Sequence, residues 1–460
     1  YTGEDTLSLH DALPILLGLF TGCLFFIKYL KISPKILLAA AMLSGVVAFL
    51  HKAGGRIIFS DDHPVFFYRL TQLKQMFPYI PFYNPFWNAG VEARDALPSG
   101  VLNVFFLFTP LISLFSIDHI YNLIVVILVF VLPPLSTWFA ARLHGLSHRT
   151  AILSATLAVG HNLICFRWSL TYGTLGFITS LAFYPLAVVL LLRVVHPKRV
   201  FAPWMSWLFI TVLFLIACWT PALIALLPVG LVLIFHLSVL ARRKWGMFAV
   251  GLTSLLVLPV ILLFVKVSPI YSVVLNPPAS AHKVENSGGT NANTNNTSKA
   301  AQASWSLRAH KAKISFTFFR SVITEYGRSA NPLLLTFGIS GLFILLRRRQ
   351  GFIWIVLVCW LLFLAGILAP LKPRLELDRM MLFLTALLCI PAGAALSRAV
   401  TVCRKNKNIG IQLVSAASFS ALAIIPFNNL KVISGNSPFQ FSFADETVSA
   451  LASSIKNLPE

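Results

Sequence analysis

The chain has 460 residues, of which 57% are hydrophobic and 11% are charged, and its mean hydropathy is +0.80. A soluble globular chain carries roughly 25% charged residues, so this composition excludes water as the main solvent of the fold. The net charge of +22 does not indicate nucleic-acid binding, because the basic residues punctuate apolar runs instead of gathering on one surface.

The first segment, residues 1–16, has neither an initiating methionine nor the basic start of a secretory signal. We interpret it as a non-native leader, such as a cloning scar. We therefore expect the acidic residues in this segment to have no functional role.

Apolar runs follow one another over most of the chain. A helix that crosses a bilayer needs about 20 mostly apolar residues. The candidate runs are residues 17–29, 36–50, 101–117, 121–141, 151–165, 175–195, 204–219, 222–240, 248–265, 333–346, 352–368, 380–396 and 411–427.

Basic clusters without acidic residues give these runs an orientation. They lie near residues 28–35, 142–149, 193–199, 242–244, 347–349 and 398–407. Because cytoplasmic loops hold the excess of Lys and Arg, the clusters alternate correctly only if residues 101–117 do not cross the membrane. We therefore expect an all-α polytopic membrane protein with about 12 spanning helices.

With this topology the chain divides into a leader, a transmembrane domain and an outer C-terminal segment. The leader is followed by a transmembrane domain over residues 17–427, with main outer loops at 52–100 and 266–332. Residues 428–460 would begin an outer C-terminal segment that continues beyond a truncation. Most acidic residues fall in these outer regions, so we expect the functional site on the non-cytoplasmic face.

The clearest candidate site is in the sequence FSDDHPVFFYRL, which contains Asp61, Asp62, His63 and Arg69. Adjacent carboxylates can hold a divalent cation or act as a general base, and an apolar wall would raise their pKa. The alternative is that the two Asp residues only cap a helix that begins near Pro64. The motif alone does not favour either interpretation.

Three other outer segments add polar and aromatic side chains. Aromatic residues are common in interfacial belts, but Arg suits bidentate binding of phosphate oxygens. Snorkelling or local ion pairing is the alternative for the arginines of the third segment. The segments are YNPFWNAGVEARDALPSG with Trp87, Asn88 and Glu92, CFRWSLTYGTLG with Arg167 and Tyr172, and LKPRLELDRMM with Arg374, Asp378 and Arg379.

A polar pair inside an apolar run and the absence of common catalytic motifs further limit the possible functions. His161 and Asn162, near the outer end of their run, are expected to make helix-packing contacts. Neither a Walker-type phosphate loop nor a dinucleotide fingerprint, a nucleophile elbow or a zinc HExxH motif is present. A nucleotide-driven transporter is therefore disfavoured.

The order of these motifs resembles a family of membrane proteins. GRIIFSDDHPVFFYRL, YNPFWNAGVEARDALPSG, RLHGLSHRTAILSA and FRWSLTYGTLGFITSLAFYPLAVVLLL are similar to pyruvoyl-tetrahydropterin-synthase-related bacterial membrane proteins. Through these proteins the chain resembles the C-type glycosyltransferase superfamily. The resemblance implies a C-type-glycosyltransferase-like core and a polyprenyl-phosphate-sugar donor. It also implies a catalytic base or metal ligand at Asp62, or alternatively Asp61, and a lipid-phosphate-binding arginine at Arg379 or Arg374.

We therefore expect a membrane glycosyltransferase-like protein of the bacterial inner membrane that transfers a sugar to a glycan, lipid or protein acceptor on the outer face. Asp62 or Asp61 would be catalytic, and a divalent metal on the same two residues is the one cofactor considered. Rival hypotheses are a transporter or flippase of lipid-linked saccharide and a non-catalytic envelope-assembly protein. The expected binding residues are His63, Arg69, Trp87, Asn88, Glu92, Arg167, Tyr172, Arg374, Asp378 and Arg379.

Overall fold

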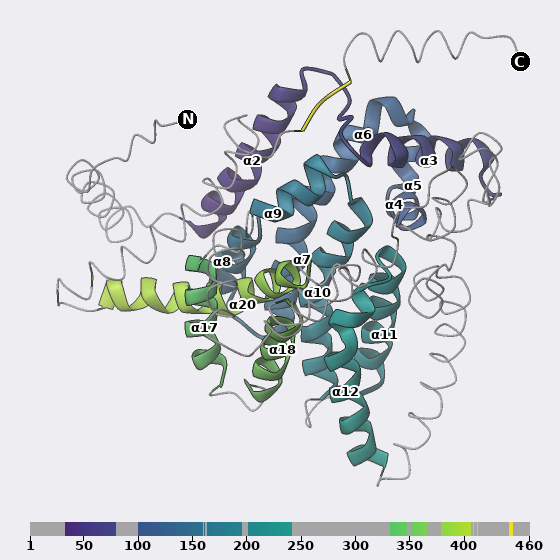
Figure 1. Cartoon of the computed structure of the whole chain (residues 1–460). Coiled ribbons are helices and arrows are strands. Elements are labelled where there is room, and N and C mark those ends of the chain that lie inside the picture. The colour runs from purple at the N-terminus through teal and green to yellow at the C-terminus, as the bar shows by residue number, and fades with distance from the viewer. Residues whose placement is uncertain are drawn as a thin grey trace, which may run out of the picture.

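The computed structural model describes residues 33–79, 100–159, 161, 163–195, 201–241, 332–346, 351–365, 379–405, 408, 412 and 441–444. Its elements (Figure 1) are α2 Pro34–Ala53, α3 His63–Met76, α4 Val101–Leu107, α5 Thr109–Leu114, α6 Ile117–Val126, the π-helix η4 Ile127–Val131, α7 Leu132–His144, α8 His148–Ala158, α9 Leu163–Phe166, the π-helix η5 Arg167–Thr171, α10 Leu175–Val194, α11 Phe201–Cys218, α12 Ala222–Ala241, α17 Pro332–Leu346, α18 Gly351–Phe363 and α20 Met380–Lys405.

The expected helical membrane architecture is confirmed for these residues. Four stretches are long and apolar enough to cross a membrane: Pro34–Ala53, Ile117–His144, Leu175–Val194 and Met380–Val402. Shorter apolar helices accompany them. The runs at 17–29 and 248–265, and that at 411–427 except for residue 412, lie outside the described residues. The total of about 12 crossings and the three-part division of the chain therefore stay predictions.

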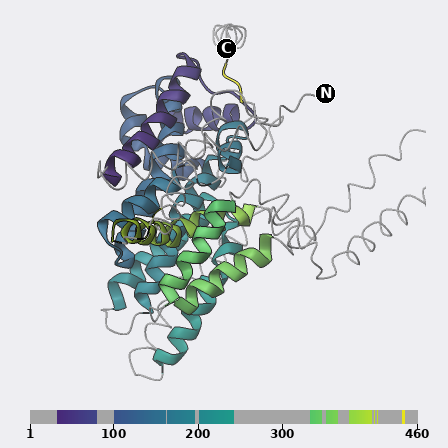
Figure 2. The ribbon, with the colours of Figure 1, turned by 90° about the vertical axis from the view of Figure 1, so that its left-hand side faces the viewer.

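Helix α20 has a distinct direction in the bundle. It is seen along its length in Figure 1 and nearly end-on in Figure 2, whereas α12 runs down the page in both views. The helix therefore crosses α12 at a steep angle. Its place among the membrane-crossing candidates rests on its length and composition.

Local sequence explains where the first helix begins and ends. The Ser33 hydroxyl accepts a hydrogen bond from the Lys35 amide at 3.4 Å, and Pro34 occupies the first turn. Gly54 ends the helix in the left-handed conformation, with φ 54°, and its N–H donates to the Leu50 carbonyl at 3.1 Å. The chain then leaves α2 at the end expected to face outward.

Two of the predicted runs are divided into shorter helices. Residues 101–117 form α4 and α5, of 7 and 6 residues, which are too short to span a bilayer, as the charge alternation requires. Residues 151–165 were expected to be one helix, and this is wrong, because α8 ends at Ala158 and α9 starts at Leu163. Thus His161 follows the end of a helix.

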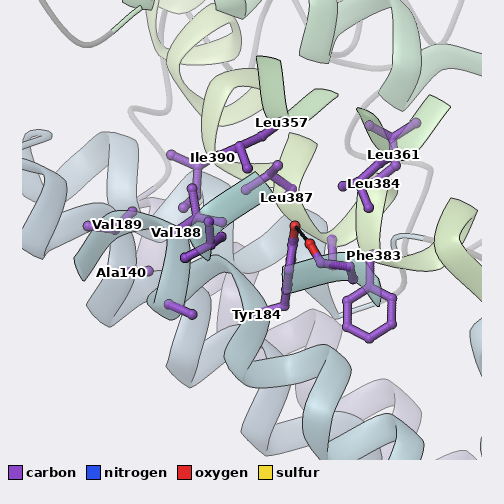
Figure 3. Close-up of a cluster of buried hydrophobic side chains, with 14 of the residues drawn as sticks. Ala140, Tyr184, Val188, Val189, Leu357, Leu361, Phe383, Leu384, Leu387 and Ile390 are labelled. Atoms are coloured by element: carbon purple, nitrogen blue, oxygen red, sulfur yellow. Dashed lines mark hydrogen bonds between the residues drawn. The ribbon is translucent and has the colours of Figure 1, made fainter. Parts of the chain in front are cut away.

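The largest part of the core lies where α10, α18 and α20 meet (Figure 3). Tyr184 of α10 is fully buried, and its ring lies 4.9 Å from that of Phe383 in an edge-on contact. Its hydroxyl donates to the Ala225 carbonyl at 3.0 Å, so the one polar atom of the side chain is satisfied.

A second core cluster forms at the other end of the molecule, beneath the acidic motif. Helix α3 contributes Phe66, Leu70 and Leu73, whose spacing puts them on one face of an amphipathic helix. Phe49 from α2 and Tyr121 from α6 belong to the same cluster. The helix that carries His63 and Arg69 is therefore fixed on the end of the bundle without crossing it.

Glycine allows close packing between α17 and α20. A Cβ at Gly341 would collide with the backbone of Pro391, including its carbonyl oxygen. Gly230, in α12, has open space around the position of a Cβ. Small residues at helix contacts let backbones approach closely in membranes.

We predict that Gly341→Ala destabilises the protein and that Gly230→Ala does not. The first change should cost about 1–3 kcal/mol through overpacking, despite the better helix propensity of Ala. The second should be neutral or stabilise by up to about 1 kcal/mol. Thermal unfolding in detergent is the measurement, and equal midpoints for the two variants would contradict the close contact.

Candidate functional site

The adjacent residues Asp61 and Asp62 form an exposed acidic turn at the start of α3. Asp62 occupies the N-cap position and Pro64 lies in the first turn, as the capping hypothesis requires. However, the Asp62 side chain makes no capping hydrogen bond, and its backbone is in the right-handed helical region, with φ −79° and ψ −9°. Capping therefore does not use the Asp62 carboxylate, which lies exposed to solvent.

The acidic turn is tied to η5 and to the segment that follows it. The Ser60 hydroxyl donates to the Leu170 carbonyl at 3.0 Å, and the Asp62 amide donates to the Tyr172 carbonyl at 3.2 Å. Gly173, with φ 68°, comes so close that a Cβ there would lie 2.7 Å from the His63 amide nitrogen. Two sequence motifs that are far apart in the chain thus form one rigid surface.

His63 points into the protein and not toward solvent. Its exposed fraction is 0%, its Nδ1 lies 3.0 Å from the Tyr121 hydroxyl, and that hydroxyl donates to the His63 carbonyl at 3.1 Å. Burial lowers the pKa of His63 to about 4, although the nearby carbonyls of Leu170 and Ser169 act in the opposite direction. A neutral, buried imidazole can help to position the turn. In this structure it is not exposed for the ligand contact that was expected from the sequence.

Opposing influences act on the Asp62 carboxyl. Removal of water by the surrounding protein raises its pKa above 3.8, and the negative charge of Asp61 acts in the same direction. The guanidinium groups of Arg69 and Arg379 lower it. The net result is a raised pKa, and the Asp62 charge also offsets part of the effect by which burial lowers the pKa of Arg69.

Arg379 is buried among aromatic rings just before α20 begins. Its exposed fraction is 7%, and its guanidinium carbon lies 3.8 Å from the ring centroid of Trp168, 5.1 Å from that of Phe177 and 5.5 Å from that of Trp219. Aromatic faces attract a guanidinium and restrict its orientation. We call these three rings the aromatic box.

The π-helix η5 carries Trp168, one of the three rings of the aromatic box. The amide and hydroxyl of Thr174 both donate to the Trp168 carbonyl, at 3.0 and 2.8 Å. Tyr172 packs on Trp168 with ring centroids 4.8 Å apart, and the Arg167 guanidinium lies 5.0 Å from the Tyr172 ring. π-helical segments are frequent at functional sites, and this one connects the acidic turn to the aromatic box.

The structure brings together only part of the predicted site. Asp62, Arg69 and Arg379 influence one another electrostatically, and Tyr172 holds the turn through its carbonyl while its ring contacts Trp168. Arg167 lies beside this group through its contact with Tyr172. The remaining predicted residues, Trp87, Asn88, Glu92, Arg374 and Asp378, lie outside the described part of the chain.

Tyr121 and Trp219 are site residues that sequence reasoning missed. Both lie close to helix ends, where aromatic residues are ordinary interfacial anchors. Nothing in the spacing of Tyr121 connects it with His63, and nothing in that of Trp219 connects it with Arg379. The one signal was the general concentration of aromatic residues in the outer segments.

The prediction of a divalent metal on Asp61 and Asp62 rests on two carboxylates alone. Among the residues with described positions, no group of three or more His, Cys, Asp or Glu side chains could hold a metal ion. Protein sites for hard cations normally supply several oxygen ligands. The metal hypothesis therefore stays a prediction, and no reaction step is derived from it.

Comparison with known proteins identifies the fold. No protein-family model and no curated protein matches the chain. Solved structures of the oligosaccharyltransferase from Archaeoglobus fulgidus do match. They are the apo form (TM-score 0.53, 14% identity, 93% of this chain and 58% of that one), a complex with Zn and sulfate (0.55, 15%, 92% and 56%), and a form tethered to an acceptor peptide with the NVT sequon (0.52, 14%, 95% and 58%).

These matches support the broader part of the resemblance seen in the sequence. The fold is similar to that of the archaeal oligosaccharyltransferase, whereas similarity to pyruvoyl-tetrahydropterin-synthase-related proteins finds no support. At 14–15% identity the likeness concerns the fold alone. The chain spans 56–58% of the length of these neighbours.

We predict that burial of His63 makes stability depend on pH between about 6.5 and about 4. In this window the unfolded imidazole binds a proton that the folded one does not, so stability decreases as pH falls. The loss should reach up to about 3 kcal/mol. Thermal unfolding of His63→Asn should show a weaker pH dependence than wild type, whereas His51→Asn, at an exposed histidine, should retain the wild-type dependence.

Proposed function

We propose that this chain is a membrane glycosyltransferase, which transfers a sugar from a polyprenyl-phosphate donor to an acceptor on the non-cytoplasmic face. The observation that carries the proposal is an exposed carboxylate, Asp62, under the electrostatic influence of Arg69 and of the buried Arg379, to which Tyr172 and Trp168 connect it. The likeness of the fold to a membrane oligosaccharyltransferase supports the choice of reaction class. Residence in a bacterial inner membrane is part of the same proposal.

In this reaction Asp62 acts as the general base. The acceptor atom, a hydroxyl oxygen or an amide nitrogen, attacks the anomeric carbon, the bond between that carbon and the phosphate oxygen breaks, and the proton that the acceptor atom loses moves to the Asp62 carboxylate. Its raised pKa makes Asp62 a stronger base than an ordinary aspartate. Its solvent exposure gives an acceptor access to the carboxylate.

Arg379 acts on the leaving group. Negative charge grows on the phosphate oxygen as the glycosidic bond breaks, and a guanidinium that is already oriented stabilises this charge most in the transition state. The aromatic box supplies that orientation without neutralising the charge. Arg69, whose charge also acts on Asp62, would bind a second phosphate oxygen.

A peptide is the first acceptor to test. One of the structural neighbours is tethered to an acceptor peptide that contains a sequon. A glycan or lipid hydroxyl remains the other acceptor class. In each case the proton that Asp62 receives comes from the acceptor atom that forms the new bond.

We predict that Asp62→Asn abolishes transfer, since the amide cannot accept the proton, and reduces the rate at least roughly a hundredfold. The assay follows radiolabelled sugar from a panel of polyprenyl-phosphate donors to sequon peptides and to lipid acceptors, in membranes that contain the full chain. Asp118→Asn, which changes an exposed aspartate in the first turn of α6, is the matched control. Unchanged transfer in Asp62→Asn would remove this residue from the mechanism, and transport or assembly would then become the better hypothesis.

We predict that Arg379→Lys also impairs transfer. Lysine keeps the charge but loses the planar fork and its stacking on the aromatic box, so the rate should fall by at least roughly tenfold. Arg398→Lys, at an exposed arginine farther along α20, should retain full activity. Wild-type rates in Arg379→Lys would show that a point charge is sufficient.

A further inference from the structure

A short segment near the C-terminus pairs with the chain just before the acidic turn. We call residues 441–444, with the sequence FSFA, the strap. Ile58 and Phe443 form an antiparallel bridge, in which the Phe59 amide donates to the Ser442 carbonyl at 3.0 Å and the Ala444 amide to the Ile57 carbonyl at 2.7 Å. The strap is visible in Figure 1 as the yellow segment beside the upper end of α2.

Aromatic contacts fix the strap on the end of α2. Phe441 is 7% exposed and stacks on Phe49, with ring centroids 6.3 Å apart and an interplanar angle of 12°. Phe443 contacts the same ring at 5.8 Å. The Lys52 ammonium lies 4.3 Å from the Phe441 centroid and the Arg56 guanidinium 5.6 Å from that of Phe443. The strap therefore has both backbone and side-chain partners.

The bridge continues directly into the candidate site. Ile58 is fully buried, and its amide donates to the Asn122 side chain at 3.0 Å. Ser60 is the next anchored residue, through Leu170, and Asp61 follows with φ 47°. The strap thus holds one side of the segment that leads into the acidic turn, while α6, η5 and Tyr172 hold the others.

We propose that the strap is a positioning element for Asp62, with Phe441 and Phe443 as its positioning residues. Its consequence for catalysis rests on the proposed function. The strap contributes no atom to the reaction. It determines where the acidic turn lies relative to Arg69 and Arg379, and its release lets the turn move away from them.

The placement of the turn has an electrostatic signature. The groups that act on Asp62 are Asp61 beside it, Arg69 from α3 and Arg379 before α20, and the Tyr121 hydroxyl of α6 also responds to its charge. If the turn moves away from the two arginines and into solvent, the carboxylate also regains water, whose removal is the largest influence on its pKa, so the raised pKa of Asp62 falls toward the ordinary value. The acidic limb of the pH–rate profile then shifts to lower pH.

The first test measures the turn without any assay of transfer. Hydrogen exchange of the full chain in lipid nanodiscs is compared between wild type and Phe441→Ala/Phe443→Ala. We expect exchange in residues 57–62 to become at least roughly tenfold faster, because the Phe59 amide loses its partner. Phe343→Ala, at a phenylalanine that is 65% exposed on α17, should leave this exchange unchanged. Unchanged exchange in the strap variant would overturn the proposal.

The second test separates positioning from mere anchoring. The strap variant should show a reduced kcat and an acidic limb at lower pH, and Phe441→Tyr/Phe443→Tyr, which keeps both rings, should restore both. Faster exchange together with wild-type kcat and pH profile would overturn the positioning role. If the wild-type chain transfers no sugar, the proposed function fails, while the exchange experiment still decides whether the strap holds the turn.

Discussion

The electrostatic interaction between Asp62 and Arg379 is the constraint on which the arrangement of the outer site depends. The carboxylate comes from the loop after α2, and the guanidinium comes from the residue that precedes α20. A buried guanidinium is costly unless charges or aromatic faces compensate it. The aromatic box and Asp62 both supply such compensation, so the packing of α10, α11 and α20 is coupled to the position of the acidic turn.

The irregular segment before α3 depends on hydrogen-bond partners from other parts of the chain. Backbone groups at the end of a membrane bundle need hydrogen-bond partners, because the hydrocarbon region supplies none. Here Asn122, the Tyr172 carbonyl and the strap supply them to a segment that has no regular structure of its own, and the Leu170 carbonyl accepts from the Ser60 hydroxyl. These bonds fix the position of the irregular backbone before α3.

The helical membrane architecture and the acidic motif could be predicted from sequence, because long apolar runs and adjacent carboxylates are local signals. The absence of a crossing at residues 101–117 followed from charge alternation. The interruption between α8 and α9 was missed, since an apolar run does not reveal where a helix ends. The inward orientation of His63 was missed as well, because it depends on Tyr121 in another helix. The proximity of Arg379 to Asp62 depends on tertiary packing, and only a family resemblance suggested it.

The backbone of Asp61 affects how variation at the two neighbouring positions should be interpreted. With φ 47°, this residue adopts a left-handed conformation that glycine, asparagine and aspartate accept more readily than other residues do. Among related chains, Gly or Asn at position 61 would satisfy the same conformational requirement. An aspartate at this position is therefore weak evidence of chemistry, whereas position 62, with an ordinary right-handed backbone, has no conformational reason to remain acidic.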